Sequence, residues 1–236
     1  MENFRSHAKI DFETRRIKAK KLIIILKNYK DLSKSIALDI GVGAGVITTE
    51  VGKISKKVFG VDLIDERISK NNYTYKKVEG LKLPFKDNYF DVIISNQIIE
   101  HIKDKDVHIN EIYRVLKKDG ICYLATPNKY SFLEPHYKLL FLSMLPMGLA
   151  NFYLLLFRKV KYYDVYPLSY NKLIKKISNK FIFENITYKI LKNPYKYSLE
   201  KKYSYSIFKY LPKCIFYIIN YLLPSWIFIL KKRNIN

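Results

Sequence analysis

The residues best suited to chemistry lie in one short, glycine-rich turn. Asp39 stands near the end of an apolar run, Ile36 to Ile40, and Gly41, Gly43 and Gly45 follow at alternate positions. The run suits a buried strand, and the glycines let the backbone of the turn approach a ligand closely. A helix is expected to begin near Gly45, and its free N–H groups would favour an anion or a carboxylate.

Two glycine-rich fingerprints compete for this turn. A dinucleotide fingerprint that starts at Gly41 requires glycine at position 46, which is Val46. The spacing present is Asp39-x-Gly41-x-Gly43-x-Gly45, which resembles motif I of the Rossmann-like S-adenosylmethionine (SAM) methyltransferases. That resemblance implies SAM as the cofactor, with its methionine part lying over the turn.

Two acids follow at the ends of the next expected strands. A strand over Lys57 to Val61 leads to Asp62, a position from which a carboxylate accepts hydrogen bonds from both ribose hydroxyls. A third strand near Tyr75 to Val78 leads to Glu79.

The resemblance continues over about residues 36 to 128. The stretches Glu79-Gly-Leu-Lys-Leu-Pro-Phe85 and Asn88-Tyr-Phe-Asp-Val-Ile-Ile-Ser95 are similar to the family that includes the ubiquinone and menaquinone methyltransferases. In that family an acid at the position of Glu79 holds the adenine amino group, and Asn96 would line the methyl-transfer site. The implied cofactor-binding residues are Asp39, Gly41, Gly43, Gly45, Asp62, Leu63, Glu79, Gly80, Leu81 and Asn96.

Two histidines are the candidate catalytic bases, because histidine titrates nearest to neutral pH. His101 follows the fourth strand, and His136 lies in Glu134-Pro-His-Tyr137, beyond the fifth strand. The alternatives are a bracing role for His101 and a simple loop role for His136. Some quinone O-methyltransferases carry Glu-x-x-Glu-His as a metal-binding pattern; here its first Glu is Gln97, so no metal is predicted.

The alternation of strand and helix patterns predicts an α/β fold, with residues 1–236 forming a single SAM-dependent methyltransferase domain. The expected architecture is a Rossmann-like, seven-stranded, mostly parallel sheet with helices on both faces and an apolar helical insertion after strand five. Residues 1–34 would form a helical cover, 35–128 the cofactor-binding core, and 129–236 the substrate-side lid or membrane-contacting region with the last two strands.

Several elements are predicted individually. Helices are expected over Phe12 to Asn28, covering the cofactor, and over Asp104 to Leu116, with Lys117 and Lys118 at its C-terminus and Gly120 closing it. The later strands are expected at Ile121 to Ala125, Phe183 to Ile190 and Pro224 to Leu230, the last of these antiparallel.

The formal net charge of +22 raises the question of nucleic-acid binding. Lysine is spread along the chain and is accompanied by abundant isoleucine, asparagine and tyrosine, which favours solvated surface and coding bias, then a membrane-facing basic surface, over RNA binding. Two unrelated cysteines, Cys122 and Cys214, predict neither a disulfide framework nor a zinc site. With no signal-like apolar segment in the first fifteen residues, a reducing cytoplasm is the expected setting.

Two apolar segments follow the region of resemblance. Leu139 to Phe157 has nineteen residues without a charge, bracketed by Lys138 and by Arg158, Lys159 and Lys161, and Pro146 and Gly148 interrupt it. Ile207 to Leu223 is broken by Lys209, Pro212 and Lys213. Neither is expected to span a bilayer; an interfacial helical pair and a hydrophobic lid over the substrate are equally favoured.

The leading functional hypothesis is O-methylation of a membrane-associated or lipid-linked small molecule, such as a glycan precursor. Oxygen is favoured because amino methyltransferases usually carry Asn/Asp-Pro-Pro-Tyr/Phe where this chain has Ser95-Asn-Gln-Ile98. The segment from Thr126-Pro-Asn128 to Tyr137 loosely resembles methyltransferases of surface-glycan or lipid-linked sugar pathways. The alternatives are a prenylated quinone methyltransferase, an RNA methyltransferase and a non-catalytic SAM-binding subunit. The expected location is cytoplasmic, peripheral on the inner face of the membrane.

Overall fold

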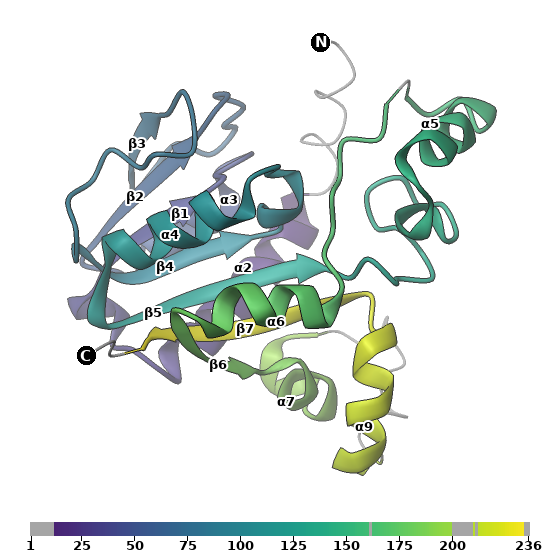
Figure 1. Ribbon diagram of the computed structural model, residues 1–236. Coiled ribbons are helices and arrows are strands. Elements are labelled where there is room, and N and C mark those ends of the chain that lie inside the picture. Colours follow the sequence, from purple (N-terminus) through teal and green to yellow (C-terminus); the bar gives the residue numbers. More distant parts are fainter. Residues whose placement is uncertain (1–11, 161, 200–209, 211, 234–236) are drawn as a thin grey trace.

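A computed structural model describes residues 12–160, 162–199, 210 and 212–233. A seven-stranded sheet runs through it in the order β3-β2-β1-β4-β5-β7-β6 (Figure 1). The strands are β1 (Ile36–Ile40), β2 (Lys57–Asp62), β3 (Thr74–Lys77), β4 (Phe90–Asn96), β5 (Leu116–Pro127), β6 (Phe181–Asn185) and β7 (Ser225–Lys232).

Helices and short turns connect these strands. The α-helices are α2 (Phe12–Lys27), α3 (Val46–Gly52), α4 (Lys105–Val115), α5 (Met147–Leu156), α6 (Tyr170–Ser178), α7 (Thr187–Lys192) and α9 (Lys213–Ile219). The 3-10 turns are η2 (Leu32–Lys34), η3 (Ile99–His101), η4 (Leu142–Met144), η5 (Tyr195–Tyr197) and η6 (Asn220–Leu222).

Strands β1 to β5 are parallel, and β7 is antiparallel to both β5 and β6. The predicted seven-stranded, mostly parallel α/β sheet is therefore confirmed. Alternate residues of each central strand face opposite layers, as the period of two requires. In β1, Leu38 packs with the α4 and α6 side chains, whereas Ala37 packs with those of α2 and α3.

The predicted N-terminal helix is confirmed as α2, which packs against one sheet face through Leu22, Ile25 and Leu26. That it covers the cofactor stays a prediction. Asp104 is the N-cap of α4, where its side chain accepts hydrogen bonds from the N–H groups of Asp106 and Val107.

The second predicted helix, Asp104 to Leu116, is confirmed as α4 to within one residue at each end, but its predicted closure at Gly120 is wrong. Helix α4 ends at Val115, and Leu116 already pairs with Phe90 as the first residue of β5. Burial of Leu116 in the core outweighs continuation of the helix. Gly120 therefore lies inside β5, and Lys117 forms an ion pair with Asp91 in place of its predicted role at a helix C-terminus.

The predicted strand over Phe183 to Ile190 is also only partly right, because β6 ends at Asn185 and α7 follows. The side chain of Asn185 accepts a hydrogen bond from the N–H of Thr187, which starts the helical turn. The Thr187 hydroxyl in turn accepts a hydrogen bond from the N–H of Ile227 in β7. This backbone N–H is therefore paired although β6 does not extend beside it.

Asn128 fixes the exit from β5. Its side-chain amide donates to the carbonyl oxygens of Tyr221 and Leu223, and its Oδ1 accepts from the N–H of Tyr130. These bonds tie the start of the apolar insertion to the segment that enters β7. Residues 132–160 then form a lobe beside the sheet that contains η4 and α5 (Figure 1).

Candidate active site

The predicted cofactor residues gather at the carboxyl edge of the parallel strands. Asp39 pairs in register with Gly60 of β2 and Ile94 of β4, so the loops after these three strands meet. Asp62 is the last residue of β2, and its register partner Lys77 comes two positions before Glu79. Asn96 ends β4. The topology therefore brings together the ends of strands that are far apart in the sequence.

The three glycines of the first loop all have positive φ, but they serve different purposes. A Cβ on Gly41 would lie 1.9 Å from Ile98 Cδ1, and one on Gly45 would lie 2.0 Å from the carbonyl oxygen of Ser69. Gly45 is therefore required by packing against backbone, whereas Gly41 is favoured by its φ of +80° and by contact with the Ile98 side chain. A Cβ on Gly43, with φ of +52°, would meet nothing within 4 Å, so Gly43 is the position that a ligand can approach.

Asp62 holds this loop in place. Its Oδ2 accepts a hydrogen bond from the Gly43 N–H at 2.8 Å, and its Oδ1 accepts one from the N–H of Leu63 at 2.8 Å. A carboxylate has about four lone-pair positions, so both oxygens keep capacity for a pair of hydroxyl donors.

The buried carboxyl of Asp39 connects the strand before this loop to the helix after it. It accepts a hydrogen bond from the Thr48 hydroxyl at 2.6 Å, which connects β1 to α3. Burial, together with the nearby Asp62 charge, raises the pKa of Asp39 to about 7 although the Thr48 hydrogen bond opposes this rise.

The residues expected around the adenine and ribose are accessible. Leu63, Glu79 and Gly80 are exposed, and a Cβ on Gly80 would also meet nothing within 4 Å. Leu81 is half-buried beside them. An open glycine on each side of a fixed carboxylate fits a nucleoside cofactor, and the individual cofactor contacts stay predictions.

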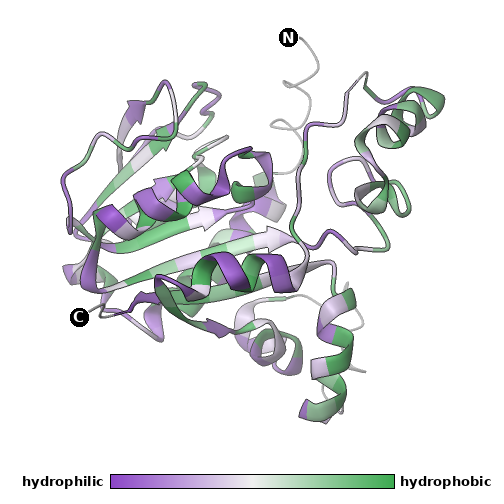
Figure 2. Cartoon of the chain, viewed as in Figure 1, coloured by the Kyte–Doolittle hydropathy of each residue, from purple (hydrophilic) through white to green (hydrophobic). Residues whose placement is uncertain are grey.

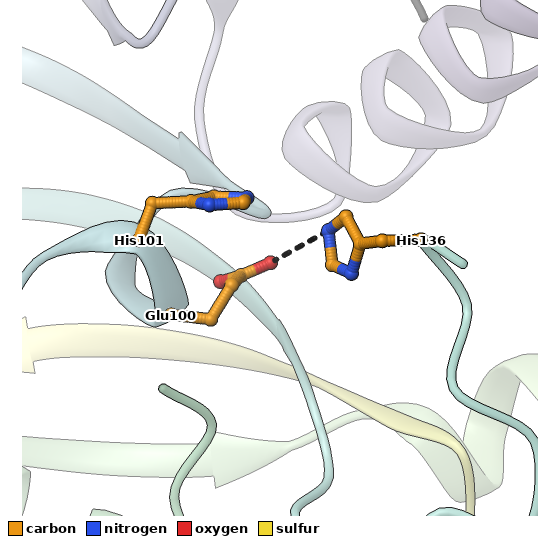
Figure 3. Close-up of side chains that lie close together, drawn as sticks. All are labelled: Glu100, His101 and His136. Carbon is orange, nitrogen blue, oxygen red and sulfur yellow. Dashed lines mark ion pairs between the residues drawn. The ribbon is translucent and has the colours of Figure 1, made fainter. Parts of the chain in front are cut away.

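The two candidate bases lie together at the same edge (Figure 3). Their ring centroids are 5.1 Å apart and the rings are nearly perpendicular. His101 belongs to η3, directly after β4, and His136 comes from the loop after β5. This loop is closed by a bridge between Leu133 and Leu140 and by a hydrogen bond from the Glu134 N–H to the carbonyl oxygen of Leu139.

His136 is oriented by a buried carboxylate. Its Nδ1 lies 2.7 Å from Oε1 of Glu134, so Nδ1 donates to the carboxylate and Nε2 is left as the acceptor. Nε2 lies 4.0 Å from Oε1 of Glu100. Burial favours the neutral ring, but the Glu134 hydrogen bond and the charges of Glu134 and Glu100 outweigh it and raise the pKa of His136.

The pKa values of His101 and Glu100 are shifted in opposite directions. Desolvation and the neighbouring His136 lower the pKa of His101, so it stays neutral and is the weaker base. Burial raises the pKa of Glu100 to about 7, although nearby hydrogen bonds and the charge of His136 oppose this rise. Perturbed groups gathered at one point are a frequent property of active sites.

Sequence reasoning missed the residues that complete this cluster. The Tyr137 hydroxyl donates to Oδ1 of Asp164 at 2.7 Å. Within the described residues, the buried Tyr163 hydroxyl and Glu100 Oε1 have no hydrogen-bond partner. Two buried polar atoms without partners indicate room for a ligand or water there. Asp164 and Tyr163 lie beyond the apolar insertion, where no motif marked them.

The same cluster offers ligands for a metal ion. Glu100, His101 and His136 each supply one ligand atom, and these atoms all lie within 4.8 Å of one another. The 4.0 Å between Glu100 Oε1 and His136 Nε2 exceeds the roughly 3.3 Å expected when both ligands lie about 2.0–2.1 Å from a tetrahedral ion. The prediction of no metal at this site stays a prediction.

Comparison with known proteins shows which part of the chain has relatives. Residues 38–124 match the methyltransferase domain family. The "Ubiquinone biosynthesis O-methyltransferase" of Pelagibacter ubique is 34% identical over 109 residues, which are 42% of this chain and 45% of that protein. The chain thus matches less than half the length of this relative.

Solved structures share the fold over nearly the whole chain. A Pyrococcus horikoshii protein has a TM-score of 0.60 at 17% identity, with 94% of this chain and 92% of that chain covered. A Haemonchus contortus phosphoethanolamine N-methyltransferase, solved with S-adenosylhomocysteine, has a TM-score of 0.55 at 19% identity and covers 95% of this chain and 59% of its own. At these identities the likeness concerns the fold alone.

Replacing Asp62 should abolish most cofactor binding. Asp62→Ala removes the acceptor for two hydroxyls and also releases the Gly43 N–H, so affinity for S-adenosylhomocysteine should fall at least about ten-fold, at about 1.5–3 kcal/mol for each charged hydrogen bond lost. Isothermal titration calorimetry measures this, with circular dichroism to confirm folding.

Asp119→Ala is the matched control, because it removes an exposed carboxylate that forms an ion pair with Lys30 away from the predicted site, and it should bind normally. If Asp62→Ala does not fold, Asp62→Asn provides the same test, because it keeps the size of the side chain and removes its charge and one of its acceptor oxygens. Unchanged affinity in a folded variant would remove Asp62 from the cofactor site.

Proposed function

We propose that this chain is a SAM-dependent methyltransferase of the Rossmann-like class that methylates a hydroxyl oxygen on an amphiphilic acceptor. The proposal is supported by the match of residues 38–124 to the methyltransferase domain family and by the seven-stranded sheet. The observation that carries this proposal is the Glu134–His136 pair, 2.7 Å between Oε1 and Nδ1, at the carboxyl edge of the sheet. A silent SAM-binding subunit would have no use for a buried carboxylate that orients an imidazole.

The reaction requires positioning and one proton transfer. Bound SAM supplies a methyl group that a positively charged sulfur has already activated. The chain must hold the acceptor oxygen in line with that methyl group and remove its proton as the new bond forms. His136 Nε2 takes this proton, and the resulting imidazolium lies between the carboxylates of Glu134 and Glu100, which favour the charged form.

The acceptor hydroxyl belongs to a phenol or to a sugar, and these two classes differ in acidity. A phenol has a pKa near 10, whereas a sugar hydroxyl is a much weaker acid, so a histidine base handles a phenol more readily. The names of the curated relatives also favour a phenolic quinone precursor. The glycan or lipid-linked saccharide stays as the second candidate, supported by the apolar insertion beside the base.

The acceptor class is tested by methyl incorporation. Purified protein with isotope-labelled SAM should label the lipid-extractable fraction of a cell extract and leave the soluble glycan and RNA fractions unlabelled. Asp62→Ala is the control for label that does not depend on the cofactor site. Label in the soluble glycan fraction, or lipid-extractable label that mild acid releases with a sugar, would replace the phenolic acceptor by the saccharide. Label in RNA would contradict the proposal.

Removal of the base should reduce turnover while cofactor affinity is kept. His136→Ala should lower kcat by roughly 10²–10⁴-fold, because the acceptor proton then has no positioned base. His101→Ala should reduce kcat less. Burial lowers the pKa of His101, whereas the hydrogen bond from His136 to Glu134 makes His136 the stronger base. Equal, wild-type turnover in both variants would give both histidines a structural role.

The pH dependence of the rate tests whether Glu134 acts on the pKa of His136 or has only a structural role. The base must be neutral, so the rate should rise with pH through the pKa of His136, which lies above its ordinary value. Glu134→Gln removes the charge that raises this pKa while burial still lowers it, so the inflection should move to lower pH. A merely structural Glu134 would leave the inflection unchanged.

Chelation should leave turnover unchanged. The cluster has one carboxylate and two imidazoles, and its ligand atoms are spaced more widely than those of a bound zinc ion. The measurement compares initial rates before and after EDTA treatment, with Mg²⁺ or Zn²⁺ added back. Loss of activity that either ion restores would show that the cluster holds a metal.

A further inference from the structure

We propose that α5 and the loop that carries His136 form a docking surface for an anionic lipid bilayer. We call this the lipid-facing surface and define it by the exposed apolar residues of two segments. These are Phe132, Leu133, Leu140 and Phe141 in the loop, and Met147, Leu149, Phe152, Leu155, Leu156 and Phe157 in and after α5. Figure 2 shows the apolar colour of this lobe, which projects away from the sheet.

Helix α5 is apolar around most of its circumference, yet only a narrow stripe of it is covered. Ala150 and Leu154, four positions apart, are its buried residues and pack with Leu142, Tyr163 and Val165. Phe152 is 66% exposed and Leu156 is 67% exposed. Contiguous exposed apolar side chains of this size are rare on a monomer and indicate an interaction site.

The helix is too short to cross a membrane. Its ten residues span about 15 Å, half of the roughly 30 Å hydrocarbon core. In the described part of the chain, no helix combines the length and the apolar character of a membrane span. A short apolar helix of this kind is suited to lie along the headgroup boundary.

The charges around this surface identify its partner. Lys138, Arg158 and Lys159 are exposed at its margins, and no acidic residue occurs from 135 to 160 in the sequence. A second copy of a chain with net charge +22 would bring like charges together. An anionic lipid surface instead attracts each nearby basic residue.

The surface adjoins the proposed base. His136 lies between Leu133 and Leu140, which pair with one another, and the rings of Phe132 and Phe141 pack edge to face with centroids 4.7 Å apart. The lobe returns to the site through Asp164, which accepts from Tyr137. Docking would thus open the site toward an amphiphile in the bilayer; this step alone rests on the proposed function.

The second apolar segment expected to help, Ile207 to Leu223, lies partly outside the described residues. In its described part, α9 and η6 expose Ile218 and Leu222. Leu145 is half-buried against Leu139 and Leu142, so its substitution is unsuited to a binding test.

Vesicle flotation with the purified full chain tests the docking surface. The protein should float with vesicles of phosphatidylcholine and phosphatidylglycerol, float less with phosphatidylcholine alone, and dissociate as salt is raised. The combined variant Phe152→Asp, Leu155→Asp and Leu156→Asp should lower the bound fraction at least about ten-fold.

Ile182→Asp is the matched control, because Ile182 is a similarly exposed apolar residue on β6, far from α5 in Figure 1. It should float like the wild type. Circular dichroism and S-adenosylhomocysteine binding confirm that each variant is folded, and Arg158→Ala with Lys159→Ala should weaken the preference for phosphatidylglycerol.

Three results would overturn the docking surface. They are a wild-type protein that stays unbound at low salt, a triple variant that floats like the wild type, and a dimer that only the triple substitution dissociates. Flotation does not depend on methyl transfer. Binding without turnover would therefore leave the docking surface intact and contradict only the proposed function.

Discussion

Parallel pairing of β1 with both β2 and β4 is the constraint on which the rest of the molecule depends. It places the loop after β1 where the strand order reverses, which is where open α/β sheets bind ligands. The hydrogen bond from the Gly43 N–H to Asp62 then joins the first loop to the end of β2. The carboxylate is held by backbone N–H groups on two loops, so its position is set before any cofactor arrives.

The central strands could be predicted from sequence because burial on both faces leaves continuous apolar runs. Ile36–Ile40 is a strand over its whole predicted length, and Asp62 ends β2. The errors occur where a distant contact decides between two local possibilities. The helix ends before Gly120 because Leu116 already pairs with Phe90 in the sheet. Thr187 lies in a helix and not in a strand, and its hydroxyl accepts a hydrogen bond from the Ile227 N–H. Neither partner is visible within the local pattern.

In the candidate site too, local features could be predicted from the sequence, whereas features set by distant contacts could not. Glycine spacing predicted the cofactor loop, but it could not show that Gly43 alone among its three glycines faces open space. The close neighbours of Gly41 and Gly45 are Ile98 and Ser69, which lie on other loops. His136 was recognisable as a titratable residue in a suitable place. Its orientation depends on the loop closing between Leu133 and Leu140, and Asp164 joins the cluster through a contact with Tyr137 across 27 positions.

The base and the lipid-facing surface share one loop, so their physical demands are connected. The Glu134–His136 interaction strengthens as water is removed, because the local dielectric constant falls. Glu134 is already buried, whereas His136 keeps partial solvent contact. Docking of Phe132, Leu140 and α5 against lipid would remove part of that water. Loss of water also favours the neutral imidazole, so contact with lipid would change both contributions to the pKa of His136, the attraction of Glu134 and the cost of burial.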